Sequence, residues 1–132
     1  IFLLSNVILC KAEIENNLNG PAAALPYLNQ IRARAGAPEY GKHNRFPAPS
    51  TKEAMNDAIL KERGYELVFE FQRRADLIRF GKYEEVVNAH LKKLGIAQPT
   101  NVTSSLRYFP YPLNDAQLNP NLAAENPSRL PK

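Results

Sequence analysis

Three carboxylates recur at every fourth residue in the middle of the chain and are the first candidates for chemistry. Glu62, Glu66 and Glu70 lie in the segment ERGYELVFEFQRRADLIRFG, residues 62–81. A step of four residues places helical side chains on one face, one above the other. Glycoside hydrolysis needs two carboxyl groups on either side of a sugar, about 5 to 9 Å apart. Carboxylates in a row on one helix do not face one another, so the spacing argues against that reaction.

The same segment has the spacing of helical ion pairs. Glu70 precedes Arg73 and Arg74 by three and four residues, and Asp76 precedes Arg79 by three. Such pairs stabilise an exposed helix by roughly 0.2–0.5 kcal/mol each, whereas removing one partner of a buried pair costs several kcal/mol. The alternative for these groups is general acid–base catalysis. We predict a structural role, rather than catalysis, for these charged residues.

Other residue types that carry chemistry are sparse. The single cysteine, Cys10, excludes an internal disulfide framework and a multi-cysteine zinc site. It lies among apolar residues, so we expect a small buried side chain rather than a reactive thiol. His90 has no second histidine or carboxylate at ligand spacing, so we assign no metal site. The sequence has no phosphate loop and no nucleophile elbow. We therefore predict no catalytic residue, no cofactor and no enzymatic activity.

Length and composition fit one domain with a modest core, which we place at residues 1–132. The net charge is +4, but the basic residues are scattered among acidic ones, so we expect no nucleic-acid partner. The apolar start is far shorter than the roughly 20 residues of a membrane span. No basic segment precedes Cys10, and Leu9 is too large to precede a lipidation cysteine. The chain has no initiator Met, so we expect a C-terminal fragment that begins inside a helix.

Apolar residues at helical spacing predict two helices at the start of the chain. The first runs to about Leu18 and ends at Gly20, because glycine readily adopts the left-handed cap. Its predicted buried stripe consists of Leu3, Val7, Cys10, Ile14 and Leu18. The second begins near Ala24, after a first turn that Pro26 makes irregular, and ends at Gly36. Two such helices form a hairpin like one tetratricopeptide unit, although no second copy is visible.

The middle of the chain predicts a long loop followed by one long helix. Residues 37–49 have no periodicity, and we expect a solvated connector there. The alternative is a loop that offers a polar ligand six side chains: Tyr40, Lys42, His43, Asn44, Arg45 and Phe46. Ser50 and Glu53 have the spacing of a capping box, and the apolar rows continue to Phe80, a helix of about 30 residues. Gly64 either loosens this helix or lets a neighbouring group approach closely.

The remainder of the sequence, residues 83–132, predicts a short helix and an irregular tail. Residues 83–94 form an amphipathic helix, and residues 96–107 form a loop. Residues 108–112 are extended, since each proline biases the preceding residue away from helix. Residues 114–118 make one helical turn, and 119–132 run irregularly. The predicted fold class is all-α: a helical hairpin, a long central helix, a short helix, long loops and an extended C-terminal tail.

Three segments, taken in order, resemble the SusD/RagB family. They are NGPAAALPYLNQIRARAG (residues 19–36), ERGYELVFEFQRRADLIRFGKY (62–83) and RYFPYPLNDAQLNPNL (107–122). Four residues, called here the signature residues, map onto the family's helix motif, and the resemblance implies a structural role for them: Glu66, Glu70, Arg73 and Asp76. Arg74 stands where relatives often have an aromatic residue, a departure that alters one packing contact.

The resemblance implies a C-terminal portion of an outer-membrane, surface-exposed lipoprotein. Such proteins capture glycans or other nutrients without catalysis, as a lid on a SusC-like TonB-dependent transporter. The family's oligosaccharide contacts and its lipid anchor lie mostly in segments upstream of those present here, so no ligand-binding residue is carried over. The alternatives are a peptide-capture relative of the same family and a helical repeat scaffold for protein–protein interaction.

Overall fold

The structure is a computed structural model that describes residues 3–96, 102–103 and 107–125, with only the backbone given for 123–125. The chain divides into two compact units, Ile1–Phe80 and Gly81–Lys132, and each is described by itself. The described residues contain seven helices and no named strand, so the predicted all-α class is confirmed.

Helices α1 (Leu4–Asn19) and α2 (Pro21–Arg34) form the predicted hairpin. Gly20 joins them with φ 90°, a left-handed conformation that glycine adopts at little cost. The expected start of the second helix near Ala24 is wrong, because α2 begins at Pro21. Proline suits the first helical position, where its missing N–H would have had no helical partner. Pro26 lies inside α2 and is accommodated without ending it.

The buried face of α1 is the opposite of the predicted one. The buried residues are Ser5, Leu9, Ala12 and Asn16. The predicted stripe is exposed, with exposed fractions of 56% for both Val7 and Ile14. Cys10 is exposed as well, so the expectation of a buried thiol is wrong. Helix α1 has apolar residues on two faces, and periodicity alone cannot say which face the hairpin covers.

The predicted 30-residue central helix is wrong, because it is two helices. Helix α3 (Lys52–Glu66) and helix α4 (Arg73–Arg79) are separated by residues 67–72. Two phenylalanines in this break have positive φ, 66° for Phe69 and 57° for Phe71, which is incompatible with a continuing right-handed helix. Both side chains are at least 90% exposed. The break contains no glycine or proline, so the sequence carries no stop signal there.

The start of α3 also differs from the prediction. Its N-cap is Thr51 rather than Ser50, and the Thr51 hydroxyl accepts a hydrogen bond from the backbone N–H of Ala54 at 3.1 Å. Threonine and serine satisfy the same free N–H groups of a first turn. A side-chain N-cap is therefore present one residue later than predicted, but the predicted capping box with Glu53 is not the one used, because Ala54 occupies the third position after Thr51.

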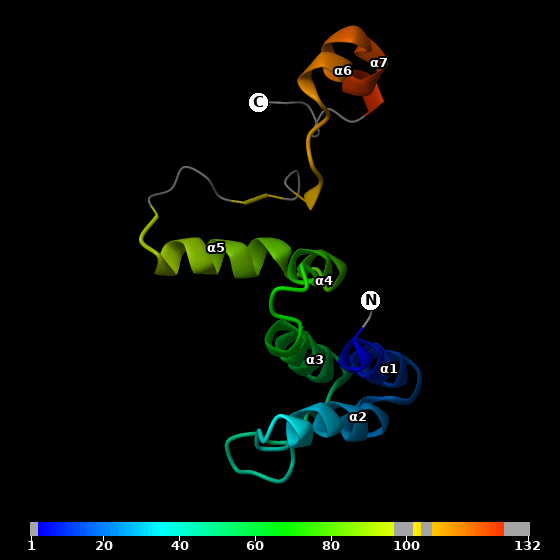
Figure 1. The fold of residues 1–132 in the computed structure, drawn as a ribbon, viewed down its shortest axis with the longest axis vertical. Helices are drawn as coiled ribbons and strands as arrows, with labels where there is room; N and C mark the ends of the chain where they lie inside the picture. The colour runs from blue at the N-terminus through cyan, green and yellow to red at the C-terminus, as the bar shows by residue number, and fades with distance from the viewer. Residues whose placement is uncertain (1–2, 97–101, 104–106, 126–132) are drawn as a thin grey trace. The chain divides into compact units, whose positions relative to one another are not determined.

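Helices α1, α2 and α3 lie side by side and enclose the core of the first unit (Figure 1). Asn16 ties α1 to α3 from inside this core, because its Nδ2 donates to the carbonyl oxygen of Lys52 and to Oδ1 of Asn56, both at 2.8 Å. The largest fully buried apolar side chains are Leu9, Leu28, Ile31, Met55 and Ile59.

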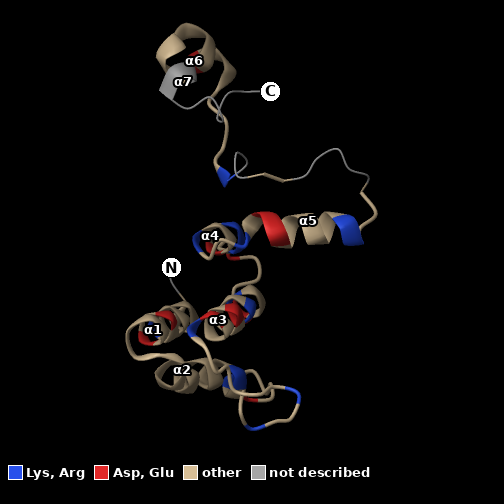
Figure 2. Ribbon diagram, turned by 180° about the vertical axis from the view of Figure 1, so that it is seen from behind, with Lys and Arg blue, Asp and Glu red and all other residues tan. Residues whose placement is uncertain are grey.

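The second unit contains α5 (Tyr83–Lys93), α6 (Leu113–Leu118) and α7 (Pro120–Glu125). Figure 2 shows α5 with acidic residues at its start and basic residues at its end, which complements the helix dipole. Helices α5 and α6 confirm the predicted short helix and helical turn. Helix α7 corrects the prediction of an irregular chain after residue 119. Residues 126–132 of that prediction lie outside the described residues.

Candidate functional site

The first buried ion pair joins the end of α2 to α3. Arg32 Nη1 lies 2.7 Å from Glu62 Oε2, and the two side chains are only 5% and 6% exposed. Arg32 Nε also donates to the carbonyl oxygen of Pro38 at 2.6 Å. The guanidinium lies 4.7 Å from the ring centre of Tyr40 and 4.6 Å from that of Phe46. Its charge is thus balanced by a carboxylate, a carbonyl and two aromatic faces, as a buried cation requires.

A second buried ion pair joins α3 to α4. Arg63 Nε lies 2.8 Å from Asp76 Oδ2, and both side chains are at most 5% exposed. Asp76 Oδ1 also accepts from Arg79 at 3.2 Å, which confirms the predicted pair three residues apart. Arg79 in turn binds Glu13 of α1. Partial burial lowers the pKa of Arg79, but the hydrogen bonds that it donates to Glu13 and Asp76 outweigh this effect and leave the pKa raised.

The loop between α2 and α3 packs inward at Tyr40 and Phe46 and is exposed along most of its remaining length. The side-chain amide of Asn29 forms two hydrogen bonds with the backbone of Tyr40. Its Nδ2 donates to the carbonyl oxygen at 3.0 Å, and its Oδ1 accepts from the N–H at 2.9 Å. The rings of Tyr40 and Phe46 meet edge to face, 5.8 Å apart, and Tyr40 is buried. The expectation of a simple connector is therefore wrong for these two residues. The four polar members of the set proposed for a ligand are exposed: Lys42, His43, Asn44 and Arg45.

The four signature residues do not gather at one point. Asp76 is buried in the second pair, and Glu66 lies 2.5 Å from Arg34 at the ends of α3 and α2. Arg73 donates to the carbonyl oxygen of Leu60 at 2.7 Å rather than to a carboxylate. Glu70 is exposed and makes no ion pair with a described residue. The expected pairing of Glu70 with Arg73 or Arg74 is thus absent from the described part of the chain.

Sequence reasoning missed the two most buried cations. Arg32 and Arg63 find their main partners 30 and 13 residues away, so no local spacing shows the pairs. One signal was available: Glu62 and Arg63 follow the buried Ile59 and Leu60 by three residues, and so continue the core-facing rows of α3. A charged residue on a core-facing row indicates a buried partner.

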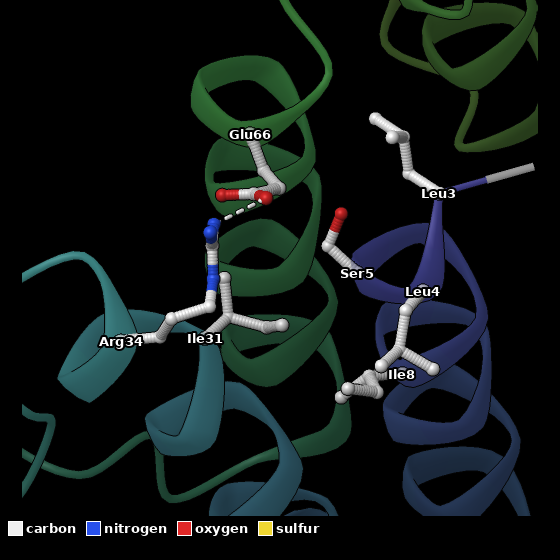
Figure 3. Close-up of a pocket in the computed structure, with 7 residues that line it drawn as sticks. All are labelled: Leu3, Leu4, Ser5, Ile8, Ile31, Arg34 and Glu66. Carbon is white, nitrogen blue, oxygen red and sulfur yellow. Dashed lines mark hydrogen bonds and ion pairs between the residues drawn. The ribbon is translucent and has the colours of Figure 1, made fainter.

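A shallow pocket of about 250 Å³ opens between the ends of α1, α2 and α3 (Figure 3). The Arg34–Glu66 pair forms one side of it, and apolar side chains form most of the remainder. Its lining residues are Leu3, Leu4, Ser5, Ile8, Ile31, Arg34 and Glu66. Two paired, opposite charges beside leucine and isoleucine make no nucleophile–base or acid–base constellation.

The described residues contain neither a cluster of metal-ligand side chains nor a helix suited to span a membrane. No three His, Cys, Asp or Glu side chains in that part of the chain lie together as metal ligands could. None of the helices described there combines the length and apolar character that crossing a bilayer requires.

The sequence matches known proteins along most of its length. Residues 1–128 match the model of the SusD family. SusD-like protein P25 of Formosa agariphila is 38% identical over 120 residues, which cover 91% of this chain and 22% of that protein. SusD-like protein P2 of the same organism is 30% identical over 129 residues, which cover 93% of this chain and 24% of that protein. SusD-like protein P38 of that organism is 35% identical over 89 residues, which cover 66% of this chain and 18% of that protein. No solved structure gives a significant match.

The chain spans about a fifth of the length of the curated relatives it matches. The family match includes all three segments on which the resemblance rested and extends between them. The helical hairpin and the all-α architecture agree with the helical fold of that family. The chain belongs to the SusD family.

Proposed function

We propose that the chain is the C-terminal helical part of a non-catalytic surface protein that captures glycans or other nutrients. In this proposal the captured ligand passes to a SusC-like TonB-dependent transporter in the outer membrane. The observation that carries the proposal is the family match over residues 1–128, because SusD proteins bind nutrients at the cell surface. The lipid anchor and most ligand contacts belong to parts of the protein that this chain does not span.

The charges of the first unit support a binding protein rather than an enzyme. Its four buried carboxyl and guanidinium groups belong to Arg32, Glu62, Arg63 and Asp76, and each has an opposite charge within 2.8 Å. A general acid or base needs a proton that substrate can reach. Groups held in buried pairs between helices are suited to fixing the helices instead.

The test is ligand binding by the full-length protein. Titration calorimetry against a glycan panel is expected to give saturable binding to at least one oligosaccharide, with no release of sugar on prolonged incubation. Binding of peptides with no glycan would move the protein to peptide capture. Purification from the outer membrane is expected to recover the transporter, and recovery of a soluble protein alone would favour a repeat scaffold.

The Arg73→Ala variant separates the structural residues from the ligand site. We expect a lower melting temperature, because the hydrogen bond to the Leu60 carbonyl is lost. Ligand affinity is expected to stay at the wild-type value at a temperature where both proteins are folded. A loss of affinity without a change in melting temperature would place Arg73 in the binding site and overturn its structural role.

A further inference from the structure

The loop between α2 and α3 has an inner side that is packed against the helices and a polar tip that is exposed. On the inner side, the rings of Tyr40 and Phe46 lie against the guanidinium of the buried Arg32. The amide of Asn29 binds the backbone of Tyr40 through two hydrogen bonds. Residues 42–45, called here the loop tip, are all exposed: Lys42, His43, Asn44 and Arg45.

Backbone hydrogen bonds hold the loop tip in one conformation. The N–H of Gly41 donates to the carbonyl oxygen of Phe46 at 2.7 Å, and the N–H of Phe46 donates to that of His43 at 2.9 Å. Gly41 has φ 79°, and a Cβ atom there would lie 3.3 Å from Cβ of Ala48, so the close turn favours glycine. Fixing four exposed residues costs conformational entropy, which a plain connector has no need to lose. A loop ordered in advance binds with less loss of entropy later.

The loop tip presents hydrogen-bond donors and positive charge. Arg45 makes no ion pair with any residue that the structure describes. Its backbone N–H donates to Nδ1 of His43 at 3.1 Å, so a neutral His43 ring carries its proton at Nε2 and is a donor there. Lys42 lies 2.8 Å from Glu39, but its side chain is 70% exposed, and exposed pairs of this kind are weak. Figure 2 shows the basic residues on the loop that follows α2. Such a tip is complementary to negatively charged oxygens.

The size and composition of the loop tip favour a small anionic group over a macromolecular surface. A stable protein interface buries about 800 Å² on each partner around an apolar, aromatic-rich core. The aromatic residues of this loop, Tyr40 and Phe46, pack inward and leave the tip without such a core. Anionic lipid surfaces are recognised by clusters of about four to eight lysines and arginines, and the loop tip has two. One acidic group on a sugar is of the size that two cations can bind.

We propose that the loop tip binds the carboxylate or sulfate group of an acidic glycan. Arg45 presents a planar guanidinium that matches two oxygens of such a group, and Lys42 adds a point charge beside it. The inference rests on the proposed capture of glycans and adds the chemical class of the sugar. A carboxylate and a sulfate both offer negatively charged oxygens, and the choice of probes separates them.

Titration calorimetry of the full-length protein against matched acidic and neutral probes tests the class of sugar. The acidic probes are oligogalacturonate, which carries carboxylates, and a carrageenan oligosaccharide, which carries sulfates. The neutral probes are the methyl ester of the first, the desulfated form of the second, and oligosaccharides of laminarin and xylan. We expect at least one acidic probe to bind at least tenfold more tightly than its neutralised form. Binding to neutral probes alone would overturn this inference and leave glycan capture in place, whereas binding to none of the probes would count against both.

Charge-removing variants of the full-length protein locate the contact. Arg45→Gln is expected to weaken binding of the acidic probe at least fivefold, and adding Lys42→Gln is expected to weaken it further. Lys61→Gln is the matched control, because it removes the same charge from an exposed residue of α3, and a change below twofold is expected. All three residues are exposed, so the melting temperatures should agree within about two degrees. Equal effects of Arg45→Gln and Lys61→Gln would show a response to net charge alone and overturn the site. Unchanged glycan affinity in Arg45→Gln, with lost binding of a hexaglutamate peptide, would overturn it in favour of an acidic protein partner.

Discussion

Arg73 lies directly over Gly64. A Cβ atom added at Gly64 would stand 2.8 Å from Arg73 Nη1, closer than such atoms approach, and the same Nη1 donates to the carbonyl oxygen of Leu60 at 2.7 Å. The absence of a side chain at residue 64 is therefore what lets the first residue of α4 reach the backbone of α3. Of the two predicted roles for Gly64, close approach is the one that the structure supports.

Gly64→Ala is expected to lower the free energy of unfolding by about 1 kcal/mol. Alanine gains about 1 kcal/mol of helix propensity, but displacing the guanidinium loses a charge-assisted hydrogen bond worth roughly 1.5–3 kcal/mol. In the Arg73→Ala background the clash is gone, and the same change is expected to stabilise by about 1 kcal/mol. Urea unfolding of the four proteins in this double-mutant cycle measures the coupling. Additive effects would show that the two residues do not touch.

Glu62→Gln is expected to lower the free energy of unfolding by about 3 kcal/mol, because it leaves the Arg32 charge buried without its carboxylate. This loss of stability is at the low end of the range for breaking a buried pair, because the Pro38 carbonyl and two aromatic rings still contact Arg32. Lys61→Gln removes a neighbouring exposed charge and is expected to change stability by less than about 0.5 kcal/mol. Similar values for both variants would argue against a buried pair.

Stability is expected to fall above pH 10 in part because of Tyr40. Burial raises the pKa of the Tyr40 hydroxyl above its usual 10.0, and Glu62 adds to the rise while Arg32 opposes it. The folded state then holds the proton more tightly than the unfolded state, so this contribution is complete below pH 10 and is lost as the pH rises through the higher folded pKa. Tyr40→Phe is expected to flatten the decline in stability above pH 10, measured by urea unfolding. Parallel curves for wild type and variant would refute the assignment.

Thr51→Ala is expected to lower the free energy of unfolding by about 1 kcal/mol, because the hydroxyl caps the first turn of α3 at the N–H of Ala54. Ser50→Ala is the matched control. Ser50 lies outside the helix, and a change within about 0.5 kcal/mol is expected there. The reverse order of effects would show that the capping box predicted from Ser50 and Glu53 is the one used in solution.

The sequence by itself determined where most helices lie and which family the chain belongs to. Gly20 and Pro21 mark the turn of the hairpin through their own backbone preferences, and the Asp76–Arg79 pair follows from a spacing of three residues. These features depend on interactions within one or two helical turns. They are therefore visible in a single stretch of sequence.

Only the tertiary structure decided which side of α1 is buried, where the central helix breaks and how the buried charges pair. Both sides of α1 have apolar residues, and packing against α2 and α3 selects the side that contains Leu9. Arg32 meets Glu62 across 30 residues of sequence, a contact that exists only once the hairpin has folded onto α3. The partners of these groups are distant in the chain, so their spacing carries no local signal. Contacts between helices decide which groups pair.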